Sequence, residues 1–482
     1  MRTTLLIDNR EVPASSGETF QRLSPIDGSL VTEAAAATLD DARLAIESAA
    51  AAFPAWAALG PNARRDILME SARLLQERVN ELIEPMMQET GAAQPWIRFN
   101  VKIASGMLRE AAALTTQIKG EVIPTDKPGA MTITVRRPVG VILSIVPWNA
   151  PIILAVRSFA LALACGNTVV MKAASPSPGT QFNLVRIMRD AGLPPGVLNY
   201  ISNAPANTPK IVESMIAHPA VRRVNITGST GSGRAVAEIC GRHLKPVLLE
   251  LGGKAPMIVL EDADIEHAAR ACAFGAYIHQ GQVCMSTERA VVENKIADAF
   301  AEKLAAKAKT IATGDPRKSD APLGSLIGKA DAARVKDLIE DAVAKGARLL
   351  AGGTADGALM TASVLDHVTP EMKIYYEESF GPVVCLVRVD GVEEAVRVAN
   401  DTEYGLSSSI FTHDVKKALE VASRLDFGCC HINGPTVHDE PQMPLGGMKA
   451  SGYGRFGGQP GISEFTELQC ITIEDPSQHY PF

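Results

Sequence analysis

Apolar residues recur at helical spacing early in the chain and then give way to short apolar runs. In residues 67–83, six apolar side chains fall on one side of a helix: Ile67, Leu68, Leu74, Leu75, Leu82 and Ile83. This spacing is part of a pattern that predicts helices across residues 38–120. Residues 121–138 then have β-rich runs around a Lys-Pro-Gly turn, which predicts a hairpin that projects from the main body.

From residue 139 onward, strand patterns alternate with helix patterns. Residues 139–146, VGVILSIV, are apolar without alternation, as expected of a parallel strand covered on both faces. A helix over residues 152–164, the strand TVVMK, a helix over 181–191 and the strands GVLNYI and VRRVNIT follow. Repeated strand–helix–strand units predict a doubly wound, mostly parallel sheet of the Rossmann-like kind.

A second α/β series begins near residue 250. PMIVL has the pattern of a strand, and Asp264 is placed to cap a helix that runs to about His279. Cys284 is therefore expected in the loop after that helix. Near the C-terminus, CITIED is typical of an edge strand.

Composition and charge narrow the class of protein. Of the 482 residues, 46% are hydrophobic, and 47 basic and 54 acidic side chains give a net charge of −7. Charges of both signs are spread along the chain, which argues against a nucleic-acid surface. The N-terminus does not have the pattern of a secretory signal. The most apolar segment, residues 139–171, is interrupted by polar residues and prolines, which disfavours a membrane span.

The eight cysteines are scattered among hydrophobic residues, and none belongs to a Cys-x-x-Cys pair. This pattern disfavours a disulfide framework and a metal site, and it favours a reducing, cytoplasmic setting. Most such cysteines pack as small core residues. Cys284 differs because it lies between a Gly-Gln turn and the polar Ser286 and Thr287, so its thiol is expected to be accessible, as a reactive thiol must be.

Three further stretches have residue types suited to binding or catalysis, each with a structural alternative. Residues 225–238, NITGSTGSGRAVAE, follow a strand and open a helix, where backbone N–H groups favour an anion; a tight connection is the alternative. Asn149 could donate to an oxyanion or cap the next helix. Glu250, in an apolar run, could be a general base with a raised pKa or the ion-pair partner of Lys254.

Together these stretches resemble the aldehyde dehydrogenase superfamily over nearly the whole chain. Seven motifs occur in the family's order: PWNAP, MKAASPSP, ITGSTGSG, LELGGK, GQVCMS, EESFGPV and PLGGMKASGYGR. The resemblance implies that Cys284 is the nucleophile, that Glu250 is the general base, and that Asn149 and the Cys284 backbone N–H donate to the oxyanion. Thiolate attack would give a thiohemiacetal, hydride transfer a thioester, and hydrolysis the acid.

The resemblance also implies NAD or NADP as cofactor and no metal. The implied cofactor contacts are Ile145, Val146, Pro147, Trp148, Lys172, Ser175, Gly228, Ser229, Gly233, Leu251, Gly252, Glu378 and Phe380. Where this chain has Ser175, the family often has a glutamate that holds the adenosine ribose and repels a 2′-phosphate. We therefore expect NADP to be accepted alongside NAD or in preference to it.

The same resemblance assigns the parts of the fold. It implies a dinucleotide-binding domain of residues 1–120 and 139–250 and a catalytic α/β domain of residues 251–450. Residues 121–138 and 462–482 would form a small β element for bridging and oligomerisation. The expected partners are a small aldehyde and further copies of the chain, as a homodimer or homotetramer, without nucleic acid or membrane.

The substrate is indicated by the helix after Asn149, which presents Ala150, Leu154 and Arg157 on one face. By the resemblance, that face lines the aldehyde tunnel, where an arginine suggests a phenol or a carboxylate; a structural ion pair is the alternative. The stretch HINGPTVHDEPQMPLGGMKASGYGRFGG is most similar to benzaldehyde, salicylaldehyde and vanillin dehydrogenases. We expect an aromatic, hydroxylated aldehyde, with a semialdehyde bound through Arg157 as the alternative.

Three other activities are less well supported. A CoA-acylating relative would not need a base at Glu250, and a non-catalytic member would not need Cys284, Glu250 and Asn149 together. A thiol esterase would not need the cofactor motifs.

Overall fold

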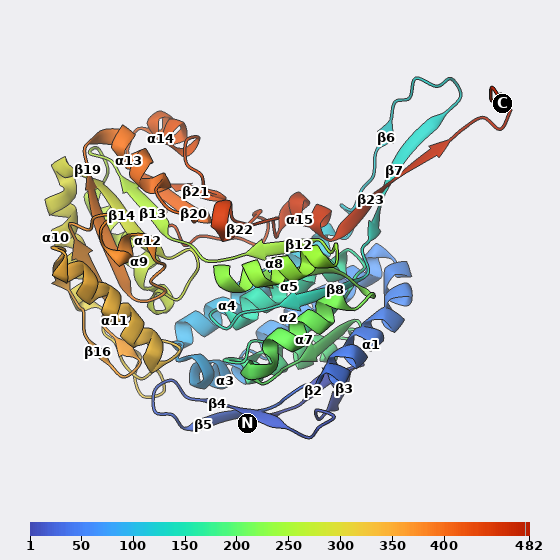
Figure 1. Cartoon of the computed structure of the whole chain (residues 1–482), viewed down its shortest axis with the longest axis horizontal. Helices are drawn as coiled ribbons and strands as arrows, with labels where there is room; N and C mark the ends of the chain where they lie inside the picture. The colour runs from blue at the N-terminus through green and yellow to red at the C-terminus, as the bar shows by residue number, and fades with distance from the viewer. Residues whose placement is uncertain (478) are drawn as a thin grey trace.

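The computed structural model describes residues 1–477 and 479–482. Two helix-covered sheets make up the body, and a narrow three-stranded sheet extends from it as an arm (Figure 1). The described residues contain no helix that is both long enough and apolar enough to cross a membrane.

The first large sheet has eight strands, and its five central strands are parallel. The chain order reverses between β8 and β11, where open α/β sheets bind ligands at the carboxyl ends of the strands. In spatial order the strands are β22 (Gly452–Tyr453), β12 (Val247–Glu250), β11 (Val221–Thr227), β8 (Val141–Ile145), β9 (Thr168–Lys172), β10 (Leu198–Ile201), β2 (Leu5–Ile7) and β3 (Arg10–Val12).

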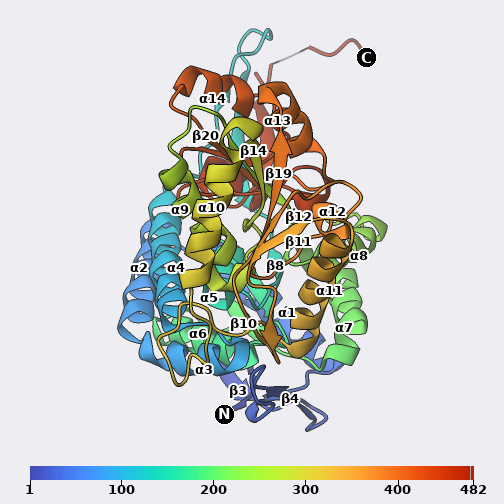
Figure 2. The same cartoon turned by 90° about the vertical axis from the view of Figure 1, so that its left-hand side faces the viewer.

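Helices cover both faces of this sheet, as expected from its continuous apolar strands (Figure 2). One face packs against α1 (Leu39–Ala58), α7 (Thr208–Ala217) and α8 (Thr230–Arg242). The other packs against α2 (Pro61–Glu77), α3 (Asn80–Thr90), α4 (Gln94–Leu114), α5 (Pro151–Ala164) and α6 (Pro178–Asp190).

The second large sheet has seven strands, all parallel to their neighbours except β15, which pairs antiparallel with β18. Its order is β15 (Arg348–Ala351), β18 (Ser363–Asp366), β19 (Val383–Val389), β14 (Thr287–Glu293), β13 (Ala255–Val259), β20 (Ser407–Phe411) and β21 (Cys429–Ile432). One face packs against α9 (Ile265–Tyr277) and α10 (Asn294–Thr310), and the other against α11 (Lys329–Ala344), α13 (Gly391–Asn400) and α14 (Val415–Ala422), with α12 (Lys373–Tyr376) nearby.

Three smaller sheets, the short helix α15 (Gly458–Glu464) and three 3-10 helical turns complete the described fold. The arm consists of β23 (Thr466–Ile473), β7 (Met131–Pro138) and β6 (Val122–Ile123), and α15 precedes it. The N-terminal sheet has the order β1 (Arg2–Thr3), β5 (Leu30–Ala35) and β4 (Thr19–Leu23), and β16 (Ala355–Asp356) pairs with β17 (Leu359–Met360).

The predicted α/β fold class is confirmed, and several local predictions hold. The Asp264 side chain accepts a hydrogen bond from the His267 N–H at the start of α9, and the first four residues of CITIED, Cys470–Ile473, lie in β23 at the edge of the arm. The apolar run over residues 67–83 belongs to two helices, because α2 ends before Arg78 and α3 begins after Val79. The division into domains at residues 250 and 450 stays a prediction.

Candidate active site

Cys284 lies in the loop between α9 and β14, where two cavities meet. The thiol is half-buried, as expected of an accessible cysteine in an ordered loop. A cavity of about 290 Å³ and another of about 250 Å³ both have Cys284 and Asn149 in their walls. The sulfur can therefore be reached from two sides, which suits a reaction between two bound molecules.

The 290 Å³ cavity has mainly apolar and aromatic walls, with polar side chains at one end. The three predicted residues Ala150, Leu154 and Arg157 all line it, as their helical spacing on α5 requires. Its other walls come from α4, α5, the end of α9 and two loops: Trp96, Phe99, Ile103, Ile153, Phe274, Ile278, Val283, Met285, Pro435, Val437, His438 and Asp439. Such walls fit a planar apolar ring.

Asn149 is buried beside the cysteine loop. Its Nδ2 donates a hydrogen bond to the carbonyl oxygen of Gln282, at 2.9 Å. The cap residue of α5 is Ala150, without a side-chain cap bond, so the alternative that Asn149 caps this helix is wrong. The indole N–H of Trp96 donates to the Asn149 carbonyl oxygen at 3.2 Å, which fixes the backbone at this point.

Glu250 ends β12 as a fully buried carboxyl group, and among the described residues neither of its oxygens has a partner at hydrogen-bond distance and angle, although Cys284 and Thr227 lie next to it. Burial raises the pKa of Glu250, and the positive charge of Arg157 partly offsets this rise. The alternative of an ion pair with Lys254 is wrong, because Lys254 Nζ bonds the Glu288 carboxylate at 2.5 Å. Glu250 is therefore a buried carboxylate available to accept a proton.

The environment of Cys284 keeps its thiol protonated. Burial raises the pKa of the thiol well above its usual value, and the neighbouring Glu250 carboxylate raises it further. A thiolate at this place needs a base that takes the proton. Glu250 is a carboxylate close enough to interact with the sulfur.

The 250 Å³ cavity lies on the other side of Cys284, at the carboxyl ends of β8, β11 and β12. Besides Cys284 and Asn149, it is lined by Pro147, Trp148, Thr227, Gly228, Ser229, Glu250, Leu251, Gly252, Glu378 and Phe380. Eight of these were predicted as cofactor contacts from the sequence. Ser229 caps α8 by accepting from the Ser232 N–H, so the positive end of that helix faces this region.

Two glycines of the predicted cofactor set are required by close packing. A Cβ at Gly233 would lie 2.4 Å from the Leu251 side chain, and one at Gly252 would lie 2.7 Å from the Glu378 carboxylate. This tight backbone leaves an open cradle in front of the helix terminus, and its donors and carboxylates fit the phosphates and sugars of a dinucleotide.

The other predicted cofactor residues lie outside the walls of this cavity. Ile145 and Val146 are buried at the end of β8, and Lys172 ends the neighbouring strand β9. Burial lowers the pKa of Lys172 to about 8. Ser175 follows in a half-buried loop, where its hydroxyl donates to the Asn203 carbonyl oxygen at 3.4 Å.

Glu288 holds the loop that carries Glu378 and Phe380, and the sequence did not indicate it. Its carboxylate accepts hydrogen bonds from the N–H of Ser379 and Phe380 and from the Ser379 hydroxyl. Phe380 has a left-handed φ of 46° and meets the Trp148 ring edge to face, with centroids 5.8 Å apart. Burial and the charge of Glu288 raise the pKa of Glu378 to about 8.

Arg157 forms a buried ion pair with Asp439, a second residue that the sequence did not single out. The two side chains are only 7% and 11% exposed, and this is the one hydrogen bond that Arg157 donates within the described residues. The structural ion pair that was the alternative interpretation of Arg157 is thus present. Arg157 still lines the 290 Å³ cavity.

A doubly wound sheet joined to a second α/β sheet, with a cysteine, a buried carboxyl group and an asparagine where two cavities meet, is the arrangement of a thiol-dependent dehydrogenase. The sequence profile described as "Aldehyde dehydrogenase family" matches residues 12–471. The chain belongs to this family, which confirms the resemblance stated from its motifs.

Similar proteins that are named for aromatic aldehydes cover 95% or more of the chain. A vanillin dehydrogenase of Pseudomonas fluorescens is 55% identical over 99% of each chain. A benzaldehyde dehydrogenase [NAD(+)] of Pseudomonas putida is 40% identical over 95% of this chain and 94% of its own. The crystal structure of a salicylaldehyde dehydrogenase from Pseudomonas putida G7 complexed with salicylaldehyde superposes with a TM-score of 0.99, at 46% identity and full coverage of both chains.

Proposed function

We propose that this chain oxidises hydroxylated aromatic aldehydes to carboxylic acids with NAD or NADP. The observation that carries the proposal is the cavity with walls of Trp96, Phe99 and Phe274 that leads to the Cys284 sulfur. The relatives named for vanillin, benzaldehyde and salicylaldehyde support it. The test is a panel of aromatic and aliphatic aldehydes with both cofactors, followed by NAD(P)H absorbance; a far higher kcat/KM for hexanal or succinate semialdehyde would refute it.

The chemistry follows from the positions of three side chains. Glu250 takes the thiol proton, and the Cys284 sulfur forms a bond to the aldehyde carbon. Asn149 and the Cys284 N–H donate hydrogen bonds to the oxygen that becomes negative. The hydride leaves that carbon with its electron pair, and a thioester remains on Cys284. Glu250 releases the thiol proton to solvent and then removes a proton from water as the water attacks the thioester; it gives this proton to the departing sulfur, which releases the acid and regenerates the thiol.

The cofactor, when bound, accepts the hydride. Within the chain, the Gly228–Gly233 turn and the start of α8 would hold its phosphates, and Glu378 its nicotinamide ribose. Phe380 and Trp148 would confine the ring beside Cys284. The walls of the 250 Å³ cavity support this assignment because Trp148, Gly228, Ser229, Glu378 and Phe380 line it together with Cys284. The 40% identical relative named for NAD(+) supports the cofactor class.

The Ser175→Glu variant tests the proposal that NADP is accepted. A carboxylate near the adenosine ribose would repel a 2′-phosphate, so kcat/KM for NADP is expected to fall at least about tenfold relative to that for NAD. Both cofactors are titrated at saturating aldehyde, and Ser175→Gln is the uncharged control of the same length. Rejection of NADP by the unmodified protein, or an unchanged preference in Ser175→Glu, would contradict the proposal.

The Arg157→Met/Asp439→Asn variant tests whether the guanidinium recognises a substrate oxygen. Removing both charges avoids leaving an unpaired buried carboxylate. The kcat/KM for 2-hydroxybenzaldehyde is expected to fall about tenfold more than that for benzaldehyde, because a hydrogen bond from a charged donor is lost. If the two substrates lose activity equally, Arg157 serves only as the partner of Asp439.

The semialdehyde alternative is disfavoured by the same ion pair. A substrate carboxylate would have to compete with Asp439 for Arg157 in a buried place, and the carboxylate of Glu250 would lie nearby. A phenolic hydroxyl makes no such demand, because it carries no full charge. We therefore keep the aromatic aldehyde as the proposed substrate.

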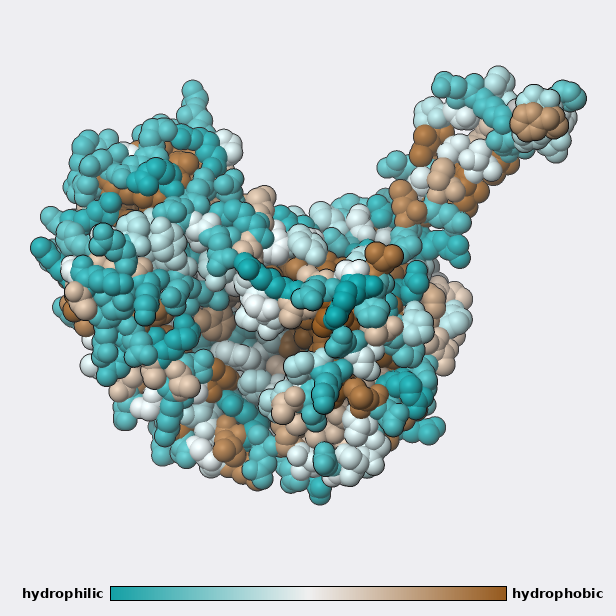
Figure 3. All heavy atoms as spheres, in the orientation of Figure 1, coloured by the Kyte–Doolittle hydropathy of each residue, from teal (hydrophilic) through white to brown (hydrophobic). Residues whose placement is uncertain are grey.

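The arm is proposed to mediate homo-oligomerisation, as a homodimer or homotetramer. The strands β23 and β7 pair over eight residues, and several apolar side chains on them and on β6 are exposed. Figure 3 shows apolar residues along this arm, away from the body. Exposed apolar surface on a projecting sheet is typical of an interface with another copy. The cytoplasmic setting expected from the cysteines stays a prediction.

A further inference from the structure

The amide of Asn149 stands at one end of a path of hydrogen bonds that begins in the N-terminal strand β4. Asn149 Nδ2 donates to the Gln282 carbonyl oxygen at 2.9 Å. The fully buried Gln282 side chain accepts from the Ile327 N–H through its Oε1, also at 2.9 Å. The Ile327 carbonyl oxygen accepts from Arg22 at 3.1 Å. The path thus connects three regions that are far apart in the sequence.

The backbone before Gln282 has a conformation that this path would hold in place. His279, Gln280 and Gly281 have left-handed φ angles of 49°, 56° and 71° in succession. For a residue other than glycine this conformation costs about 1–2 kcal/mol, so it persists only where surrounding contacts fix it. One such contact is the hydrogen bond from Gln280 Nε2 to the Ser325 carbonyl oxygen, at 2.8 Å. Residues 325–327 therefore hold the turn and Gln282 together.

Arg22 is fixed at the far end of the path by a second partner. Its Nε and one terminal nitrogen donate to the Glu89 carbonyl oxygen, at 2.9 and 2.6 Å, while the same terminal nitrogen reaches Ile327. A guanidinium presents its donors in one rigid plane, so it can bridge two carbonyl groups at fixed spacing. Arg22 thereby sets the position of Ile327 relative to the first sheet's helices.

We propose that Gln282 and Arg22 are positioning residues for the oxyanion donor Asn149, a proposal that rests on the proposed function. Arg22 fixes Ile327, the Ile327 N–H fixes the Gln282 side chain, and the Gln282 carbonyl aligns the Asn149 amide. Stabilisation of a developing oxyanion depends on donors that are aimed in advance. A small displacement of Asn149 slows the chemical step without weakening the binding of aldehyde or cofactor.

The test compares Arg22→Met and Gln282→Met, which remove the hydrogen bonds and keep most of the side-chain volume. Each is expected to lower kcat about tenfold with both KM values unchanged. Arg22→Lys, which keeps a charged donor, is expected to retain more of kcat than Arg22→Met. Because both residues act through one path, the kcat of the double variant is expected to be no lower than that of the less active single variant.

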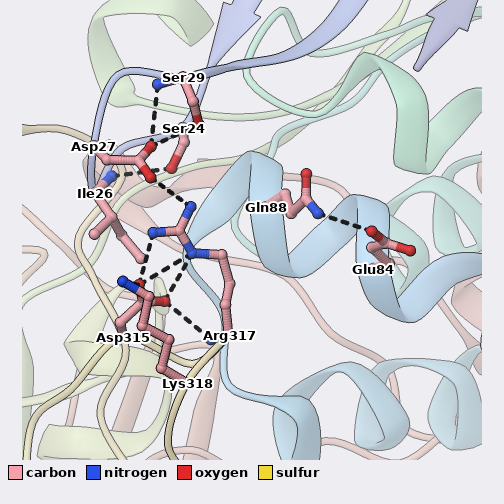
Figure 4. A network of polar contacts seen from close by, with 9 residues as sticks. All are labelled: Ser24, Ile26, Asp27, Ser29, Glu84, Gln88, Asp315, Arg317 and Lys318. Carbon is pink, nitrogen blue, oxygen red and sulfur yellow. Dashed lines mark hydrogen bonds and ion pairs between the residues drawn. The ribbon is translucent and has the colours of Figure 1, made fainter.

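Arg317→Met is the matched control, because Arg317 also joins the N-terminal segment to a loop of the other half. Its guanidinium bonds Asp27 at 2.8 Å and Asp315 at 2.7 Å, and the network contains no residue of the path to Asn149 (Figure 4). Arg317→Met removes a contact between the same two parts of the chain. It is expected to leave kcat unchanged.

Hydrogen exchange of the peptide spanning residues 278–286, followed by mass spectrometry, gives a readout that needs no activity. Faster exchange is expected in Arg22→Met than in the unmodified protein or Arg317→Met. Equal exchange and equal kcat in Arg22→Met and Arg317→Met would overturn the proposal. If the unmodified protein oxidises no aldehyde, the proposed function fails, whereas the exchange comparison still decides whether Arg22 holds the turn.

Discussion

Cys284→Ala is expected to abolish NAD(P)H formation from every aldehyde while the protein stays folded. Cys284 and Asn149 line both cavities, and of these two residues only the cysteine can form a covalent bond to a carbonyl carbon and then release it as an acid. Loss of the nucleophile removes the whole covalent path, so kcat is expected to fall by about 10⁴-fold or more. The measurement is NAD(P)H absorbance with the preferred aromatic aldehyde and cofactor.

Cys430→Ala is the matched control for this variant. Cys430 is also half-buried, but it lies in β21 and lines neither cavity. Its replacement is expected to leave kcat unchanged, and circular dichroism with thermal unfolding shows that both variants are folded. A Cys284→Ala protein that still forms NAD(P)H would remove Cys284 from the chemistry and contradict the proposed mechanism.

The regular parts of this fold were predictable because local patterns determine them. The uninterrupted apolar run at β8 reflects a strand covered on both faces. Asp264 caps α9 through a hydrogen bond from the N–H of a residue only three positions further along the chain. The N-terminal strands were not predicted. They are two to six residues long, so their hydrophobic alternation has no room to repeat.

In the site too, residues that lie in local sequence motifs were predictable, and partners that are distant in the sequence were not. Asn149, Glu250 and Cys284 stand in motifs that the sequence displays, and the structure brings Cys284 together with both of the others. Asp439 could not be found, because it is 282 positions from Arg157 in an irregular loop. Glu288 lies on a strand whose buried pattern shows nothing of its role. The packing of the two sheets brings such partners together, and the spacing of residues along the chain does not predict this packing.

At Glu250 and Arg157, the neighbouring residues determine which ion pairs form. Lys254 could pair with either Glu250 or Glu288, and it pairs with Glu288. This leaves Glu250 buried without a hydrogen bond, an arrangement that costs stability and is retained where a group must react. The same neighbourhood gives Arg157 a partner of its own in Asp439.

Glu250→Gln is expected to slow both steps in which Glu250 is the proposed base, thiolate formation and thioester hydrolysis, and to slow hydrolysis more. Glutamine cannot accept the proton of the attacking water, so hydrolysis of the thioester is expected to slow by about 10²- to 10⁴-fold. Rapid mixing is expected to show a burst of about one NAD(P)H per site that forms more slowly than in the unmodified protein, followed by still slower release of acid. Asn149→Ala is the contrasting variant, because an oxyanion donor acts before the hydride leaves, and it is expected to slow the burst itself.

The pH dependence of hydrolysis is expected to separate the two roles proposed for Glu250. Because burial raises its pKa above 4.5, the ionised fraction and the rate of hydrolysis rise with pH through that raised pKa, and this rise is absent in Glu250→Gln. The contribution of Glu250 to the stability of the folded protein changes in the opposite direction and falls as the pH rises. A raised folded-state pKa contributes stability that is present below pH 4.5 and lost as pH rises through the folded-state pKa.

Glu250→Gln is therefore expected to unfold at the same temperature as the unmodified protein or a higher one at neutral pH, despite its loss of activity. Activity and thermal unfolding are measured on the same preparation across the pH range. A Glu250→Gln protein without a burst would show that the carboxylate is needed before hydride transfer, as the base for the Cys284 thiol. Because the thiol has a raised pKa, it also needs a proton acceptor. The size of the burst therefore shows how far Glu250 contributes to deprotonation of the thiol and how far to hydrolysis of the thioester.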